Sequence, residues 1–240
     1  MIYPSFDQIK ELLTADLQSG NLKNTKKARD EKRCYHRLPL KLELYADSIT
    51  PVMAIRRLKR ASHHCFLLES AEQSKQWGRY SFLGYDPTME ITCQNRMAKI
   101  TNRETGTKVT KHTDHSGSLI RKIMEENRAP RLAEMPPFSG GLVGYFSYDY
   151  IKYSEPSLKL DAKDEESFQD VDLMLFDKVI AFDNYRQKVI LIVNIKTDDL
   201  ENAYHTGEQE LQAMASLLTC AQMADNPPLK LKSRFRYLFD

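Results

Sequence analysis

The chain has 240 residues, of which 41% are hydrophobic and 28% are charged, proportions that exclude a chain disordered throughout. Lys and Arg number 35 against 33 Asp and Glu, so the net charge is only +2 and provides no overall field for nucleic acid or an anionic membrane. The amino terminus lacks a secretion signal, and no stretch approaches the about 18 continuous apolar residues of a membrane span. We therefore expect a soluble, cytoplasmic protein that binds neither nucleic acid nor membrane.

The first 37 residues are expected to form a helix and a linker. Ser5 and Gln8 have the spacing of a capping box, and apolar residues then repeat at helical intervals to about residue 18. The following segment, 22–37, is basic and lacks apolar periodicity, which predicts a linker or mobile arm. It also lacks the interleaved aromatic side chains on which bases stack, so it does not favour a nucleic-acid contact.

Most of the predicted elements after Leu38 are strands. Apolar and polar residues alternate from Leu40 to Leu44, which is the period of a half-buried strand. Thr50 and Pro51 fit an N-cap and a first helical position, so a short helix is expected next. Turn signals separate the remaining segments, which we expect to be strands at 65–71, 79–85, 89–94, 97–101 and 107–111, a helix at 116–127 and a glycine-rich strand at 140–148.

The last third of the chain adds a hairpin and a long helix. Two apolar runs, 171–182 and 189–195, flank Asp183 and Asn184 as a turn, and a helix is expected over about 198–223. Most connections between strands are short, which favours antiparallel pairing. The predicted fold class is therefore α+β, with largely antiparallel sheets and helices packed around them.

We divide the chain into three parts. Residues 1–37 form the helix and linker, and residues 38–225 form the main domain. The tail, 226–240, opens with an Asn-Pro-Pro break and continues as an apolar and basic segment with nothing obvious to pack on. We expect this tail to be a linker toward a further domain that the chain lacks.

No pattern of metal ligands or catalytic nucleophiles is recognisable. The cysteines are scattered and are expected to be mostly buried thiols, and the histidines lack the spacing of a metal-binding helix. The cluster Gly140, Gly141 and Gly144 lacks the lysine and threonine of a phosphate-binding loop, so we expect it to allow close strand packing. We therefore expect no metal bound by these cysteines and histidines, which are Cys34, Cys65, Cys93, Cys220, His36, His63, His64, His112, His115 and His205.

Two neighbouring strand ends carry the residue types that an amino-acid ligand needs. Glu69 can pair with an ammonium group, Ser70 can donate and accept a hydrogen bond, and Arg79 can clamp a carboxylate. Trp77 or Tyr80 can cover an aromatic body. The alternative is structural: Glu69 and Arg79 form a cross-strand ion pair, and Ser70 caps a turn.

Two longer motifs favour the ligand-binding interpretation. The segments Leu67–Pro87, with LLES and WGRYSFLGYDP, and Pro137–Glu155, PFSGGLVGYFSYDYIKYSE, resemble the amino-terminal region of anthranilate synthase component I. The segment 38–58, LPLKLELYADSITPVMAIRRL, is similar to the strand and Thr-Pro-capped helix of that region. The resemblance covers most of the chain from Leu38 to Asp240, and it implies a β-sandwich-like domain with helices packed around it.

The resemblance also implies an effector site. In that family the inhibitor tryptophan lies against the LLES strand end, and residues of a carboxy-terminal domain complete the pocket, so this chain alone is expected to bind tryptophan weakly, if at all. The resemblance assigns the effector site to Ser70, with Leu68, Glu69, Gly78, Arg79, Tyr80 and Ser81 as neighbours. Residues expected at the interface with the further domain are Tyr145, Tyr148, Asp149 and Tyr153.

The implied activity is that of a lyase in tryptophan biosynthesis. Members of this family convert chorismate and ammonia or glutamine to anthranilate and pyruvate, with Mg²⁺ in the carboxy-terminal domain and a glutamine amidotransferase subunit as partner. The catalytic motifs of that domain do not occur in these 240 residues. We therefore expect an allosteric, feedback-regulatory portion that has no catalytic residue, metal site or cofactor of its own and is inactive by itself. The alternatives are the large subunit of aminodeoxychorismate synthase and a stand-alone amino-acid-binding module.

Overall fold

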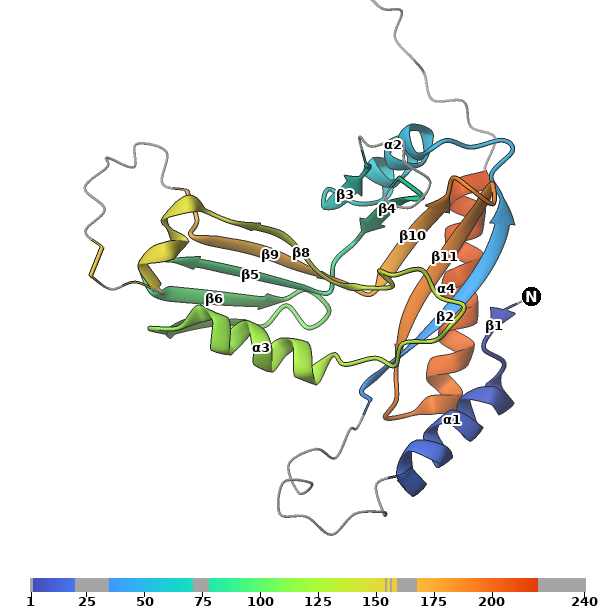
Figure 1. Cartoon of the computed structure of the whole chain (residues 1–240), viewed down its shortest axis with the longest axis horizontal. Coiled ribbons are helices and arrows are strands. Elements are labelled where there is room, and N and C mark those ends of the chain that lie inside the picture. Colours follow the sequence, from blue (N-terminus) through green and yellow to red (C-terminus); the bar gives the residue numbers. More distant parts are fainter. Residues whose placement is uncertain are drawn as a thin grey trace, which may run out of the picture.

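The computed structural model describes residues 2–19, 35–70, 78–153, 155, 157–158 and 168–219, which form two antiparallel sheets surrounded by helices (Figure 1). The first sheet has the strand order β1-β2-β11-β10-β4-β3. Its strands are β1 (Ile2–Tyr3), β2 (Arg37–Tyr45), β3 (Cys65–Leu68), β4 (Tyr80–Tyr85), β10 (Lys178–Asp183) and β11 (Lys188–Lys196). The second sheet has the order β7-β6-β5-β9-β8. Its strands are β5 (Met89–Gln94), β6 (Met97–Asn102), β7 (Lys108–His112), β8 (Gly141–Phe146) and β9 (Val171–Phe176).

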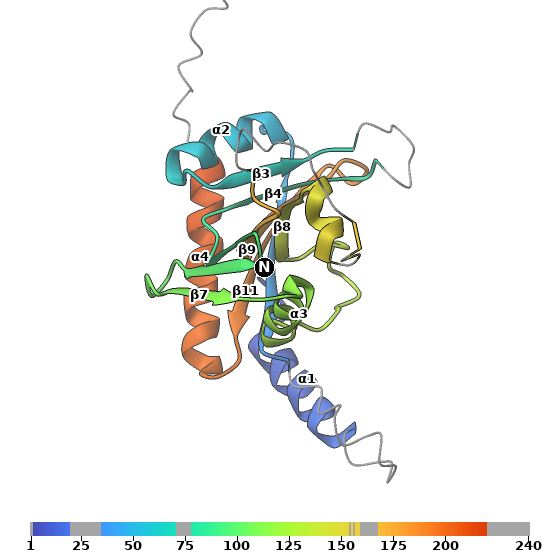
Figure 2. The ribbon, with the colours of Figure 1, turned by 90° about the vertical axis from the view of Figure 1, so that its left-hand side faces the viewer.

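Helices pack on both sheets, which confirms the α+β class. They are α1 (Phe6–Ser19), α2 (Pro51–Ala61), α3 (Ser116–Glu126) and α4 (Leu200–Thr219), with a short 3₁₀ helix, η1 (Tyr148–Tyr153). Figures 1 and 2 both show α4 lying along the first sheet. Within the described ranges, no helix is both long and apolar enough to cross a membrane.

The two central strands of the first sheet are buried on both faces. Along β10, Ile180 and Phe182 face the core that α2 and α4 cover, whereas Val179 and Ala181 belong to a second cluster on the opposite face. This two-sided burial explains why the sequence of β10 is a continuous apolar run rather than an alternating one. On α4, the side chains that close the first core are Tyr204, Leu211, Met214 and Leu218.

The second sheet has a separate small core. Ile123 of α3 and Tyr153 of η1 pack against Ile91, Cys93 and Val171 of the sheet. Tyr153 is only 5% exposed, so the expectation that it lines an interface with another domain is wrong. Its hydroxyl donates to the carboxylate of Asp170 over 2.8 Å, which holds η1 against the start of β9.

The apolar run expected over 171–182 is divided between the two sheets. Its first half, β9, pairs with β5 and β8, and its second half, β10, pairs with β4 and β11. The chain crosses at Asp177, where the backbone carbonyl accepts hydrogen bonds from the amide and the side chain of Asn194. The hairpin turn expected at Asp183 and Asn184 is confirmed as the connection between β10 and β11.

The remaining predicted elements agree with the structure to within a few residues. The strand expected over 65–71 ends at Leu68, and the helix expected over 198–223 is described over Leu200–Thr219. Segments 20–34, 71–77 and 220–240 lie outside the described residues, so most of the expected basic linker, Trp77 and the tail do too.

The glycine cluster serves close strand packing, as expected. Gly144 on β8 has a φ of +156°, and a Cβ atom there would overlap the carbonyl oxygen of Asp172 on β9. At Gly140 a Cβ would lie 3.1 Å from the carbonyl oxygen of Phe176. These two glycines therefore let β8 and the segment before it approach β9 more closely than other residues permit.

Candidate functional site

A surface hollow lies where four segments meet at one end of the first sheet. It has a volume of about 460 Å³ and is lined by Pro51, Glu69, Ser70, Ser81 and Asn184; we call it the Ser70 hollow. Pro51 begins α2, Glu69 and Ser70 follow β3, Ser81 lies in β4, and Asn184 lies in the turn after β10. In Figure 1, α2, β3 and β4 gather at this end of the sheet.

Strand register brings these segments together. Leu68, the last residue of β3, pairs with Phe82 of β4, so Glu69 and Ser70 continue along the start of β4. On the other side of β4, Asp183 of β10 pairs with Tyr80. The start of β4 is therefore flanked by Glu69 and Ser70 on one side and by the β10–β11 turn on the other.

The amino end of α2 is held by a side-chain cap. The hydroxyl of Thr50 accepts a hydrogen bond from the backbone amide of Met53 over 3.2 Å, and Pro51 occupies the first turn. This arrangement is the one predicted from the Thr-Pro pair, because proline has no amide hydrogen and is tolerated there. The partial positive charge of a helix amino terminus is therefore directed toward this end of the sheet.

Backbone and side-chain hydrogen bonds fix Asn184 beside β4. Its backbone amide donates to the carbonyl of Arg79 over 2.9 Å, and its own carbonyl accepts from the side chain of Gln187 over 2.6 Å. Its side-chain amide donates to the carbonyl of Gly78 over 3.4 Å and to the hydroxyl of Ser81 over 3.5 Å. The side-chain contacts are long and therefore weak, whereas the backbone contacts are short.

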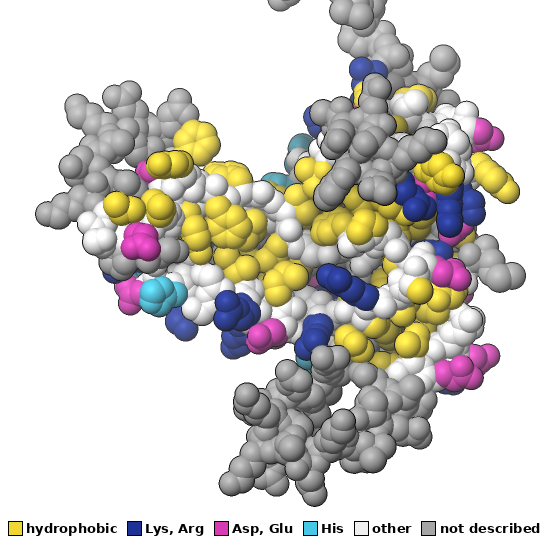
Figure 3. Space-filling model, viewed as in Figure 1, with side chains coloured by type: hydrophobic (Ala, Val, Ile, Leu, Met, Phe, Trp, Pro, Cys, Tyr) yellow, Lys and Arg dark blue, Asp and Glu magenta, His cyan; other side chains and the backbone are white. Residues whose placement is uncertain are grey.

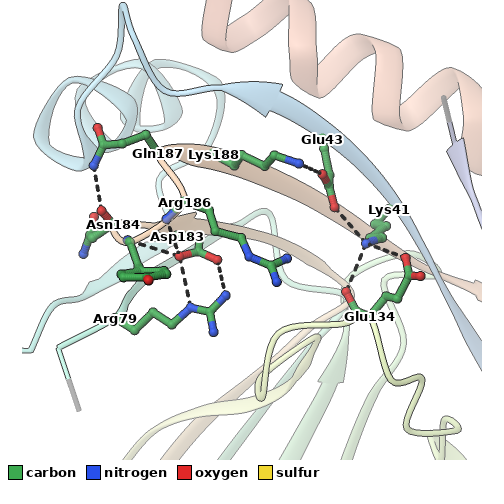
Figure 4. A network of polar contacts seen from close by, with 10 residues as sticks. Lys41, Glu43, Arg79, Glu134, Asp183, Asn184, Arg186, Gln187 and Lys188 are labelled. Carbon is green, nitrogen blue, oxygen red and sulfur yellow. Dashed lines mark hydrogen bonds and ion pairs between the residues drawn. The ribbon is translucent and has the colours of Figure 1, made fainter. Parts of the chain in front are cut away.

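Arg79 binds the carboxylate of Asp183 (Figure 4). The guanidinium donates through Nε, over 3.1 Å, and through Nη2, so the pair is bidentate. Burial by itself would raise the pKa of Asp183, but hydrogen bonds from Arg79 and from the backbone amides of Arg186 and Tyr185 lower it overall. The alternative of a cross-strand Glu69–Arg79 ion pair is therefore not found among the described residues, and the guanidinium expected to clamp a ligand carboxylate already binds Asp183.

A chain of ion pairs continues from this turn across the first sheet. The side-chain ammonium of Lys188 lies 2.6 Å from Glu43, and that of Lys41 lies 2.8 Å from Glu43 and 3.4 Å from Glu134 (Figure 4). Hydrogen bonds from Lys188 and Lys41 lower the pKa of Glu43 to about 2. Nζ of Lys41, whose side chain is only 6% exposed, also donates to the backbone carbonyl of Glu134 over 3.0 Å, so this network anchors the Glu134 segment to β2.

The structure brings three of the seven expected effector residues into the hollow. Glu69, Ser70 and Ser81 line it, whereas the other four lie beside it in the chain without lining it: Leu68, Gly78, Arg79 and Tyr80. The Tyr80 ring stacks on Phe82 at a centroid distance of 5.7 Å, and the Arg79 guanidinium lies 4.8 Å from the centre of that ring.

Two lining residues, Pro51 and Asn184, were not assigned to the site from the sequence. Pro51 lies in the Thr-Pro segment on which part of the family resemblance rests, so a signal for it was present. Asn184 was recognised only as a turn residue. Nothing local marks it as a neighbour of Ser81, because the pairing of β10 with β4 joins residues about a hundred positions apart.

A second cavity lies at the junction of the two sheets and contains none of the expected effector residues. Its volume is about 520 Å³, and its walls include Arg37 of β2, Met124 of α3, Phe138 and Asp177. Burial raises the pKa of Asp177 to about 6, and the positive charges of Lys178 and Arg37 offset only part of this effect. Oδ1 of Asp177 has no hydrogen-bond partner among the described atoms.

Comparison with known proteins gives the chain a family. A family profile described as chorismate binding enzyme matches residues 63–237. Anthranilate synthase component 1 of Acetivibrio thermocellus is 29% identical over 237 residues, covering 98% of this chain and 43% of the relative. The corresponding protein of Saccharomyces cerevisiae is 30% identical, with the same two coverages, and anthranilate synthase alpha subunit 1 of Arabidopsis thaliana is 31% identical, covering 95% of this chain and 40% of the relative.

The chain thus spans about two fifths of the length of these curated relatives. Among solved structures, anthranilate synthase component I from Streptococcus pneumoniae matches with a TM-score of 0.44 and 20% identity, over 73% of this chain and 38% of that one. The family profile, by contrast, covers most of the chain. The chain therefore belongs to the family of chorismate-binding enzymes, and the curated relatives that it resembles along most of its length are anthranilate synthases.

Proposed function

We propose that this chain is the amino-terminal, tryptophan-binding regulatory portion of a longer anthranilate synthase large subunit. The observation that carries the proposal is the Ser70 hollow, which unites Glu69 and Ser70 of the LLES motif with Ser81 of the GRYS motif. In the complete protein, tryptophan bound there lowers the conversion of chorismate and ammonia or glutamine to anthranilate and pyruvate.

The chemistry of the hollow suits an amino acid. Glu69 supplies a carboxylate for an ammonium group, and the hydroxyl of Ser81 and the amide of Asn184 supply hydrogen-bond donors. The volume lies within the range of about 300–1,000 Å³ that is usual for small-molecule sites. No aromatic side chain of the described residues lines the hollow, so the indole ring is held by other parts of the complete protein.

Regulation follows from differential binding. Tryptophan inhibits if it binds more tightly to an arrangement of the complete protein that turns chorismate over slowly, and such coupling free energies are typically about 1–3 kcal/mol. Because the same residues bind the effector but take no part in the reaction, a change at Ser70 alters inhibition without altering the chemistry.

The rest of the complete protein docks, in this proposal, on the exposed end of β8 and on η1. Tyr145 and Phe146 are 38% and 49% exposed, and Tyr148 is 88% exposed. Figure 3 shows hydrophobic side chains gathered over this part of the molecule. An apolar surface of this kind is a common mark of an interface.

The remaining properties of the complete protein are also proposals. They comprise lyase activity in tryptophan biosynthesis, a glutamine amidotransferase subunit as partner, a cytoplasmic location and Mg²⁺ bound by the catalytic part. The described residues contain no group of three or more His, Cys, Asp or Glu side chains that could hold a metal ion, so we assign Mg²⁺ no ligands among them.

A second candidate function is chorismate binding by this chain itself. The observation that favours it is the description of the matching family profile, which covers residues 63–237 and therefore includes four of the five residues that line the Ser70 hollow. The two functions differ in their ligand, since chorismate has two carboxylates and no ammonium group, whereas Glu69 is suited to an ammonium group.

Titration calorimetry of the 240-residue chain separates the two functions. We expect heat of binding with millimolar L-tryptophan and none with chorismate, and we expect Ser70→Phe to weaken tryptophan binding at least about tenfold by filling the hollow. Ser118→Phe, on the exposed surface of α3, is the matched control and should bind tryptophan like the unmodified chain. Binding of chorismate without tryptophan would favour the second candidate, and unchanged tryptophan binding by Ser70→Phe would remove Ser70 from the site.

A further inference from the structure

We propose that Asn184 is the residue that recognises the carboxylate of the bound amino acid, and that the Ser70 hollow is a site for the α-amino-acid head group. Glu69 takes the ammonium group, and the side-chain amide of Asn184, with the hydroxyl of Ser81, takes the carboxylate. This inference rests on the proposed function and specifies which groups of the ligand the hollow binds, namely the ammonium group and the carboxylate.

The need for such a residue follows from the charges at the site. A carboxylate ligand requires donors, yet among the described residues that line the hollow Glu69 is the one with a charged side chain. Arg79, which is close in sequence to Ser81, does not line the hollow, and its Nε and Nη2 atoms bind Asp183. The side chain of Asp183 is 1% exposed, so withdrawing Arg79 would leave a buried carboxylate without its cation. Arg79 therefore stays with Asp183, and the ligand needs another donor.

Asn184 meets this need because its position is fixed while its side-chain donors are weakly engaged. Its backbone makes the 2.9 Å and 2.6 Å hydrogen bonds with Arg79 and Gln187 described above. Its side-chain nitrogen contacts Gly78 at 3.4 Å and Ser81 at 3.5 Å, distances at which little hydrogen-bond energy is gained. A hydrogen bond to a ligand carboxylate would be charge-assisted and about twice as strong as a neutral one.

The neighbours of Asn184 also fix which of its side-chain atoms faces Gly78 and Ser81. The carbonyl of Gly78 can only accept a hydrogen bond, so the nitrogen of the Asn184 amide, and not its oxygen, must point to this side. Ser81 lies on the same side and can donate its hydroxyl hydrogen as a second contact. The nitrogen of the amide is therefore held next to Ser81, which also lines the hollow.

The electrostatic layout supports a zwitterionic head group. Pro51, at the amino end of α2, lines the hollow together with Asn184, and the partial positive charge of a helix amino terminus favours a carboxylate nearby. Glu69 provides the opposite sign in the same hollow. The hollow thus combines the partial positive charge of the α2 amino terminus with the negative charge of Glu69. These match the carboxylate and the ammonium group of an amino acid.

The test compares three ligands and four variants of the 240-residue chain by titration calorimetry. The ligands are L-tryptophan, tryptamine, which lacks the carboxylate, and indole-3-propionate, which lacks the ammonium group. The variants are Asn184→Asp, Asn184→Ala and Glu69→Gln, with Gln209→Glu on the exposed face of α4 as a matched change of amide to acid. Circular dichroism checks that each variant remains folded.

We expect Asn184→Asp to weaken tryptophan binding at least about tenfold, since it replaces a donor by a like charge, and to leave tryptamine binding unchanged or tighter. Asn184→Ala should weaken tryptophan binding about threefold to tenfold without affecting tryptamine. Glu69→Gln should weaken tryptamine and tryptophan but not indole-3-propionate. Gln209→Glu should bind all three ligands like the unmodified chain.

The binding data distinguish a wrong assignment of Asn184 from a wrong effector site. If neither the 240-residue chain nor the complete protein that contains it binds tryptophan, both are wrong. If the unmodified protein binds tryptophan and both Asn184 variants bind it within twofold of the same affinity, the effector site stands and the role of Asn184 is refuted. An equal loss of tryptophan and tryptamine binding in the Asn184 variants also refutes that role, because it would show a loss unrelated to the carboxylate.

Discussion

Asp177 is a buried carboxyl group whose ionisation opposes the folded state. It lies where the chain passes from β9 to β10, and burial raises its pKa from 3.8 to about 6. Lys178, Arg37 and Glu210 are the charged groups whose fields act on it, and the two cations offset only part of the penalty. The folded state therefore holds a proton on Asp177 at a pH at which the unfolded chain has lost it.

The sign of the resulting pH dependence is fixed by this difference. Between about pH 4 and pH 6 the folded state binds more protons than the unfolded state at this site, so the contribution of Asp177 to the free energy of unfolding falls as the pH rises. Asp177→Asn removes the titration. We expect the variant to be more stable than the unmodified chain by roughly 2 kcal/mol at pH 8 and the difference to shrink toward pH 4. Urea unfolding at both pH values measures it, and a difference that does not change with pH would contradict the assignment.

At the scale of single elements, β8 depends on a residue without a side chain. Gly144 combines a positive φ with a close approach to the carbonyl of Asp172 on β9. A positive φ and a close backbone neighbour each disfavour any residue other than glycine, and both occur at position 144. The pairing of β8 with β9 places the exposed Tyr145 and Phe146 at the edge of the second sheet, so the surface proposed for docking depends on this glycine.

We expect Gly144→Ala to lower the free energy of unfolding by about 2–4 kcal/mol, because the new methyl group overlaps the Asp172 carbonyl and the backbone angle is unfavourable for alanine. The control is Gly117→Ala on exposed α3, where the nearest atom to the added Cβ is the Tyr150 hydroxyl at 3.4 Å. That change should be neutral or stabilising by up to about 1 kcal/mol, since alanine is the better helix former. Chemical denaturation compares the two, and equal effects would show that β8 does not need its glycine.

For the whole molecule, a cluster of four phenylalanines joins the two sheets. Phe66 of β3 lies 4.8 Å from Phe176 of β9 between ring centres, and Phe82 of β4 lies 5.6 Å from Phe138. Phe66 and Phe138 complete the cluster at 6.4 Å. Edge-to-face pairs of this kind add to the energy of apolar burial. Each sheet otherwise has its own core, covered by its own helices. We therefore expect the phenylalanine cluster to link the stability of one sheet to that of the other.

Phe176→Ala should therefore destabilise the molecule by about 3–5 kcal/mol and weaken the coupling between the sheets. Hydrogen exchange measured by NMR should show that amides of β5 and β6 lose more protection than amides of β2 and β11. Phe168→Ala removes an aromatic ring that is 59% exposed and should change stability by less than about 1 kcal/mol. Equal loss of protection in both sheets would indicate a single core rather than two coupled ones.

Features with local causes were predictable from the sequence. The strand Met89–Gln94 was predicted at its observed bounds, because its pattern and its flanking turns lie within a few residues. The Thr50 cap and the Asp183–Asn184 turn were also recognised, since capping and turn chemistry act on neighbouring backbone groups. Within the candidate site, the LLES and GRYS motifs were sufficient to select Glu69, Ser70 and Ser81, which the structure places around one hollow.

The amino-acid sequence by itself determined the fold class, most element bounds and the family, because hydrophobic periodicity, caps and motifs are properties of short segments. Only the tertiary structure decided that residues 171–182 divide between two sheets, that Arg79 binds Asp183, and that Asn184 lies beside Ser81. Each of these depends on which strands pair across the chain; Arg79 and Asp183, for example, are 104 residues apart. An apolar strand with a given local pattern can pair in either sheet. Which sheet it joins is therefore decided by the packing of the whole molecule.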